Sequence, residues 1–168
     1  LGMDLYLYNR VPGTVYGMEE EYVGCAWLDD LQCAYGTLEG FLAAEGGEKI
    51  SVYCVFDNEE VGSSTKQGAA STFLADTLER IWSGLGRDAL SLKCAVADSF
   101  LVSADNAHAQ HPAHPEKYDP SCRVYMNQGI VIKQSANQKY TTDAMSEAVT
   151  KKICRDAQVP YQVFANHS

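Results

Sequence analysis

The chain has 168 residues, of which 46% are hydrophobic and 21% are charged, a composition typical of one globular domain with a buried core. Its formal net charge of -9 argues against a nucleic-acid partner, because such a surface needs clustered lysines and arginines. No apolar run reaches the roughly 18 residues of a transmembrane helix, and the first residues lack a signal-peptide pattern, so no membrane partner is expected.

Six cysteines are spread through the chain, and none belongs to a CxxC pair. Most of them lie within apolar patterns, which favours free, buried thiols over a disulfide framework or a cysteine-based zinc site. We therefore expect a protein of the reducing cytoplasm. The cysteines are Cys25, Cys33, Cys54, Cys94, Cys122 and Cys154.

The first predicted elements are two short strands, at residues 4–8 and 22–27. Apolar residues at helical spacing then predict a helix from Asp29 or Asp30 to Ala44. Capping of this helix is the simplest role for the two aspartates, because carboxylates accept hydrogen bonds from the first free N–H groups. Residues 49–56 are rich in β-branched and aromatic side chains and predict a buried strand.

An acidic loop at residues 57–63 follows this strand, and a second helical pattern comes next. Ser63 or Ser64 can cap that helix, which we expect to end at Gly84 and Gly86. Residues 88–97 are ambiguous by pattern. A strand is predicted at residues 98–103, and a loop with three histidines and three prolines follows it at residues 105–120.

The last third of the chain predicts a strand, a helix and a strand. A short buried strand is expected at residues 129–133, and Thr141 or Thr142 can cap the helix that follows. Residues 161–165 predict the final strand. This alternation of helices and strands indicates an α/β protein with three layers.

Carboxylates stand at three of the predicted junctions: Asp29 with Asp30, Glu59 with Glu60, and Asp105. Two cations that share one site require such a set, because one carboxylate bridges them and others complete each ion. A further carboxylate must accept the proton of the attacking water, and an adjacent pair of glutamates suits that division. Acidic loops at strand ends are common, however, and solvent exposure is the competing interpretation of all these residues.

Four segments in the same order resemble the M18 family of zinc aminopeptidases, the aspartyl aminopeptidase family. The acidic loop reads Asp-Asn-Glu-Glu-Val-Gly-Ser, and residues 103–112 read Ser-Ala-Asp-Asn-Ala-His-Ala-Gln-His-Pro, similar to the family pattern S-x-D-x-A-H-A-x-H-P. Residues 28–31 resemble its L-D-N/D-L element, and residues 132–142 resemble a further stretch. The related M42 peptidases share the E-E-V-G core but not the histidine-containing segment.

The resemblance implies a role for each acid. Asp29 would bridge two zinc ions, while Asp105 would complete the first ion and Glu60 the second. Glu59 would be the general base that takes a proton from the zinc-activated water and passes it to the leaving amine. Asp57 would support a neighbouring ligand.

The resemblance also implies substrate-binding positions. His108 and His111 match the rim of the active site, and Lys133 and Tyr140 match positions that face the substrate or stabilise the oxyanion. The cofactor would be two Zn²⁺ ions, with Mn²⁺ or Co²⁺ as alternatives. Peptides would be the substrates, and a homo-oligomer would be the assembly of the full-length protein.

The match implies that residues 1–168 are part of one catalytic metallopeptidase domain, incomplete at both ends. Its fold would be a three-layer α/β/α sandwich with a mixed, mostly parallel sheet. The resemblance implies that three parts of the family's proteins lie outside these residues: the N-terminal segment, the oligomerisation insert and the C-terminal segment. Two histidines that bind zinc are also expected outside the chain. His167 is interpreted as an ordinary loop residue and not as one of them.

The leading hypothesis is a metal-dependent aminopeptidase that hydrolyses the N-terminal residue of peptides, with acidic residues, Asp or Glu, expected as the preference. The isolated piece would then bind metal weakly and have little or no peptidase activity. Two alternatives stay open. One is a non-catalytic scaffold or binding module, and the other is an M42-like aminopeptidase.

Overall fold

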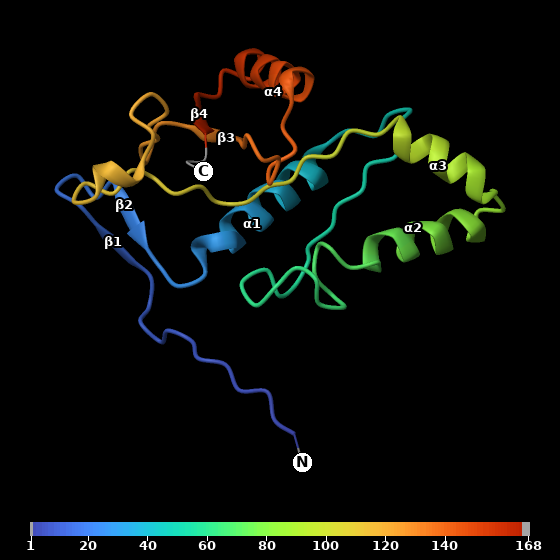
Figure 1. Cartoon of the computed structure of the whole chain (residues 1–168), viewed down its shortest axis with the longest axis horizontal. Helices are drawn as coiled ribbons and strands as arrows, with labels where there is room; N and C mark the ends of the chain where they lie inside the picture. Colours follow the sequence, from blue (N-terminus) through green and yellow to red (C-terminus); the bar gives the residue numbers. More distant parts are fainter. Residues whose placement is uncertain (1, 166–168) are drawn as a thin grey trace. The chain divides into compact units, whose positions relative to one another are not determined.

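The computed structural model describes residues 2–165. It forms two compact units, residues 1–106 and 107–168, and we describe each by itself. The first unit contains β1 (Thr14–Tyr16), β2 (Tyr22–Gly24), α1 (Leu28–Ala43), α2 (Phe73–Gly84) and α3 (Ala89–Ala97) (Figure 1). The second contains the 3-10 helix η1 (Pro115–Lys117), β3 (Ile130–Gln134), α4 (Ala144–Asp156) and β4 (Tyr161–Ala165). Within residues 2–165, no helix is both long and apolar enough to cross a membrane.

Strands β1 and β2 form an antiparallel hairpin in which Thr14 pairs with Gly24 and Tyr16 with Tyr22. Gly17, with φ of 108°, begins the turn between them, a conformation that favours glycine. The strand predicted at residues 22–27 is therefore confirmed only as far as Gly24. Strand β1 was not predicted from the sequence.

Helix α1 confirms the helix predicted up to Ala44, where the backbone becomes extended. Its first residues are irregular, since Asp29 (φ -90°, ψ 111°) and Asp30 (φ -115°, ψ 21°) are not helical and the peptide bond between them is cis. Regular helix therefore begins at Leu31. No side-chain hydrogen bond caps its N-terminus, so the predicted capping by the aspartates is wrong.

Helix α2 starts later than predicted because the residues before it form a series of turns. The amide of Gly68 donates to the carbonyl of Thr65 at 3.0 Å, and the amide of Ser71 donates to Gly68 at 3.0 Å. The predicted cap at Ser63 or Ser64 is therefore wrong, while the predicted end at Gly84 is confirmed. The ambiguous residues 88–97 are helical, because the Asp88 side chain caps α3 by accepting from the amides of Leu90 and Ser91.

Three predicted strands do not form within the first unit. Residues 4–8, 49–56 and 98–103 are assigned to no strand in the part of the chain that the structure describes. Leu7, Ile50 and Leu101 are among the most exposed apolar side chains, at 104%, 73% and 75%. A strand needs a neighbour that accepts and donates its backbone hydrogen bonds, and sequence pattern alone does not supply one.

The second unit is a parallel strand–helix–strand motif. Strands β3 and β4 pair in parallel from Ile130 with Tyr161 to Gln134 with Ala165, and α4 connects them. Both predicted strands are confirmed. A side chain at Gly129 would meet the carbonyl of Pro160, so only glycine fits where the two strands begin.

Helix α4 is capped by Asp143 and Ser146, which bond each other's backbone amides in a capping box. The predicted cap at Thr141 or Thr142 is wrong by one or two positions. The buried residues of the whole described chain are Val124, Ile132 and Cys154 among the hydrophobic side chains. All six cysteines are free, as predicted, but Cys154 alone is buried and Cys25, Cys54 and Cys94 are exposed.

The chain is thus a mixed α/β structure with one antiparallel and one parallel pair of strands among residues 2–165. His167 lies outside the described residues.

Candidate metal centre

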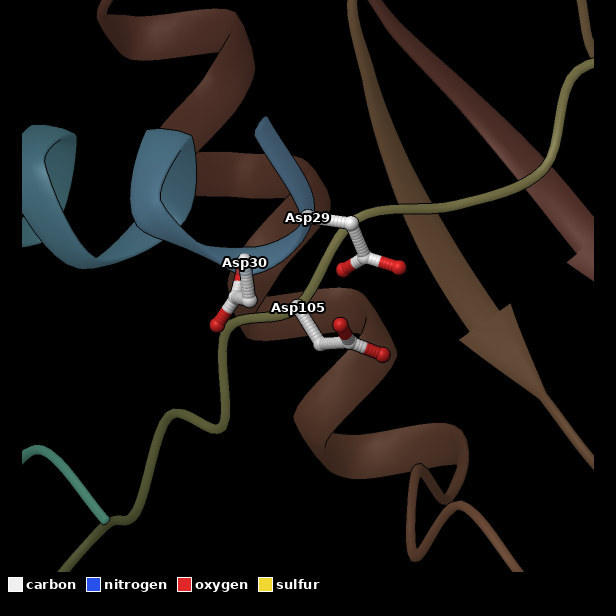
Figure 2. A group of neighbouring side chains, drawn as sticks. All are labelled: Asp29, Asp30 and Asp105. Atoms are coloured by element: carbon white, nitrogen blue, oxygen red, sulfur yellow. The ribbon is translucent and has the colours of Figure 1, made fainter. Parts of the chain in front are cut away.

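Three aspartates converge in the first unit. One oxygen each of Asp29, Asp30 and Asp105 lies within 4.8 Å of the others. Figure 2 shows Asp29 and Asp30 at the irregular start of α1 and Asp105 on the segment that passes beside it. The structure therefore brings together two of the predicted metal ligands, Asp29 and Asp105, from distant parts of the sequence.

The cluster concentrates negative charge. Partial burial and the nearby carboxylate of Asp105, with which it shares a hydrogen bond, raise the pKa of Asp29 above its usual value, and Asp30 and Glu60 add to the effect. Burial, then Glu60, Asp105 and Asp29, raise the pKa of Glu59. The carboxylates of Glu59 and Glu60 thus interact electrostatically with those of the aspartates, while their roles as base and ligand stay predictions.

The acidic loop is held in shape by its own backbone. The amide of Asp57 donates to the carbonyl of Gln67 at 3.2 Å, which closes the loop at its base. Asn58, with φ of 63°, donates from its side chain to the hydroxyl of Thr65 at 3.2 Å. The carboxylate of Asp57 accepts from the amide of Asn58 at 2.8 Å, so its supporting role for a ligand stays a prediction.

Asp30 was predicted to be a helix cap and not a metal ligand. Its Oδ1 atom is buried and has no hydrogen-bond partner among the described residues. The only signal in the sequence was its position beside Asp29, and adjacency does not reveal that both side chains turn to the same place.

The donor set fits a divalent metal ion. Carboxylate oxygens are ligands that Zn²⁺, Mn²⁺ and Mg²⁺ all accept. Burial and neighbouring carboxylates raise the pKa of Asp29, and a cation between the three aspartates would offset both effects. It would also provide a partner for the buried oxygen of Asp30.

The predicted substrate residues lie in the second unit. His108 and His111 are exposed, and the Nδ1 atom of His111 accepts from the amide of Ala113 at 3.1 Å. The ammonium of Lys133 lies 5.5 Å from the centroid of the Tyr140 ring, a cation–π contact between half-buried side chains. Their roles toward a substrate stay predictions.

A carboxylate cluster that fits a divalent cation, in an α/β chain, defines a candidate metalloenzyme centre. The family model described as Aminopeptidase I zinc metalloprotease (M18) matches residues 1–168. The chain belongs to the M18 family.

Known relatives agree with this family. The chain is 45% identical over 168 residues to "Probable M18 family aminopeptidase 2" of Clostridium acetobutylicum, with 100% of this chain and 39% of the relative covered. It is 36% identical over 167 residues to "Aspartyl aminopeptidase" of Caenorhabditis elegans, with 96% of this chain and 35% of the relative covered. The chain spans less than two fifths of these relatives.

A solved structure supports the fold. The mApe1 dodecamer of Saccharomyces cerevisiae matches with a TM-score of 0.79 and 26% identity, over 94% of this chain and 37% of that chain.

Proposed function

We propose that the complete protein is a metal-dependent aminopeptidase that hydrolyses the N-terminal residue of peptides at a dinuclear zinc site. The observation that carries this proposal is the convergence of Asp29, Asp30 and Asp105 within 4.8 Å in a chain of the M18 family. The chain is then one part of a single catalytic domain, a three-layer α/β/α sandwich with a mostly parallel sheet.

In this proposal Asp29 and Asp105 would hold one metal ion, and Asp29 and Glu60 would hold the other. Histidines from elsewhere in the complete protein, together with these carboxylates, make up the ligand set. When bound, zinc acts as a Lewis acid that lowers the pKa of a bound water and polarises the scissile carbonyl.

Glu59 is the proposed general base of the reaction. Adjacent residues of a loop point in different directions, so Glu59 can face the attacking water while Glu60 faces the metal. The Glu59 carboxylate accepts a proton from that water and delivers it to the leaving amine. Asp57, at the base of the same loop, supports a neighbouring ligand through its hydrogen-bonded position.

Substrates with an N-terminal Asp or Glu are the proposed preference. The name of the nematode relative, aspartyl aminopeptidase, supports it. Lys133 supplies a positive charge for the substrate carboxylate, Tyr140 holds that ammonium by its ring, and His108 and His111 line the rim. A homo-oligomer is proposed because a relative forms a dodecamer, and a cytoplasmic location is proposed from the free thiols.

Metal analysis and turnover of the complete protein test the proposal. We expect about two zinc ions per protomer and hydrolysis of aspartyl p-nitroanilide that is lost on chelation and restored by zinc. Unchanged turnover in protein shown to be metal-free would contradict it. The 168-residue chain alone should show little or no turnover under the same conditions.

A further inference from the structure

The side chain of Asn106 connects the two segments that carry Asp29 and Asp105. Its Nδ2 atom donates to the carbonyl of Leu28 at 3.0 Å. Leu28 immediately precedes Asp29, and Asn106 immediately follows Asp105. This hydrogen bond therefore joins the chain next to one aspartate to the chain next to the other.

Cys33 fixes the orientation of the Asn106 amide. The Cys33 thiol, on the next turn of α1, donates to the Oδ1 atom of Asn106 at 2.9 Å. A rotation of the amide by half a turn would place its NH₂ group against the thiol and its oxygen against the Leu28 carbonyl, and lose both bonds. Asn106 and Cys33 are half-buried, so water competes weakly for these groups.

We propose that Asn106, oriented by Cys33, is a positioning residue that sets the separation of the Asp29 and Asp105 carboxylates for a shared metal ion. The inference rests on the proposed function, because it takes both aspartates as metal ligands. Asparagine suits the role, because one side chain accepts at one end and donates at the other. The family pattern S-x-D-x-A-H-A-x-H-P leaves position 106 open, so it assigns no role to this residue.

Measuring the zinc affinity of variants of the complete protein distinguishes a positioning role of Asn106 from a role in folding stability alone. Asn106→Leu keeps the approximate shape and removes both hydrogen bonds. Cys33→Val removes the thiol donor, whereas Cys33→Ser keeps a donor at the same place. Asn9→Leu is the matched control, because Asn9 is an exposed asparagine of the first unit whose side chain, among residues 2–165, accepts a local hydrogen bond from the amide of Val11.

The zinc dissociation constant, measured by competition with a chromogenic chelator, and the visible spectrum of the Co²⁺-substituted protein are the two readouts. We expect Asn106→Leu to weaken zinc binding about 10- to 100-fold and to shift the cobalt bands. Cys33→Val should weaken zinc binding and shift the cobalt bands in the same way, but by a smaller amount. Cys33→Ser and Asn9→Leu should match the wild type in both measurements.

Wild-type affinity and an unchanged cobalt spectrum in Asn106→Leu would overturn the inference, even if its thermal stability fell. If Asn106→Leu does not fold, the Cys33 pair decides, and equal zinc affinity of Cys33→Val and Cys33→Ser overturns it. A wild-type protein that binds no zinc would instead refute the proposed function, so the two failures are distinguishable.

Discussion

The hydroxyl of Tyr53 donates a hydrogen bond of 2.7 Å to the carbonyl of Ala34 in α1. The Tyr53 ring also lies 5.8 Å from the ring of Phe41 on the same helix, centroid to centroid. Tyr53 belongs to the segment that leads into the acidic loop, and Asp29 lies in the irregular first turn of α1. These contacts therefore join the two parts of the first unit that carry the proposed ligands and the proposed base.

Changing Tyr53 to Phe removes this hydrogen bond and keeps the ring contact. We expect the free energy of unfolding to fall by about 1 kcal/mol, because the Ala34 carbonyl loses a half-buried donor. Urea unfolding of the complete protein measures this. Tyr53→Leu, which also loses the ring, should fall further. Equal stability of Tyr53→Phe and the wild type would show that the hydrogen bond contributes nothing.

Elements whose partners are local could be predicted from the sequence. Strand β4 follows from its aromatic and β-branched residues and helix α1 from its helical spacing, and β3 pairs with β4 across a single helix. Residues 49–56 and 98–103 have equally strong strand patterns but lie unpaired in the structure. Pairing depends on a neighbour in space, so a pattern within one segment cannot guarantee it.

The site was predictable to a similar degree. The family motif identified Asp29 and Asp105, and the structure brings their oxygens together. Asn106 could not be found in this way, because the family pattern leaves its position open. Asp30 could not be found either, because a capping aspartate and a clustered one have the same local sequence. The irregular backbone at Asp29 and Asp30 decides between them, and that backbone depends on tertiary contacts.

Glu59 and Glu60 are adjacent, and their substitution should separate proton transfer from metal binding. In the complete protein, Glu59→Gln should lower kcat by about 10²- to 10⁴-fold while zinc stays bound, because the amide cannot accept the proton. Glu60→Gln should lose zinc, because an amide oxygen carries no charge for the ion. Steady-state kinetics with metal analysis of the same samples measures both, and a normal kcat in Glu59→Gln would exclude it as the base.

Asp30→Asn tests whether the third aspartate is a required ligand. We expect this variant to keep its zinc, because the family element L-D-N/D-L accepts asparagine at this position. Its metal-free form should be more stable than the wild type near pH 7, because one of the clustered charges is gone. Thermal unfolding with and without chelator measures this, and Asp29→Asn, which should lose zinc, is the comparison. Loss of zinc in Asp30→Asn would make Asp30 a ligand.

Glu147 links helix α4 to strand β3 and should make the second unit sensitive to acid. Its carboxylate forms an ion pair with Lys151 and accepts from Gln134 at 2.6 Å. The hydrogen bond from Lys151 lowers the pKa of Glu147 below 4.5, against the opposing effect of burial. Because the folded state holds the proton less tightly, this stabilisation is present above pH 4.5 and is lost as the pH falls through the lowered pKa.

Glu147→Gln keeps an acceptor for Gln134 and removes the charge. Hydrogen exchange in the complete protein should show weaker protection of the α4 amides in this variant at about pH 7, and the difference from wild type should shrink as the pH falls below 4.5. Lys152→Gln is the matched control, since Lys152 pairs with Asp156 on the exposed side of the same helix. A difference between Glu147→Gln and wild type that stays constant with pH would assign the effect to packing instead of charge.

Lys133 should determine the preference for acidic substrates if its charge faces the substrate carboxylate. Lys133→Met keeps the length of the side chain and removes the charge, so kcat/KM for an aspartyl substrate should fall about 10-fold or more, while that for a leucyl substrate should change little. Tyr140→Phe retains the ring below the ammonium and should keep the selectivity, whereas Tyr140→Leu removes the cation–π contact and should weaken it. Equal losses on both substrates in Lys133→Met would place Lys133 at the reacting carbonyl instead, where it stabilises the oxyanion whatever the side chain of the substrate.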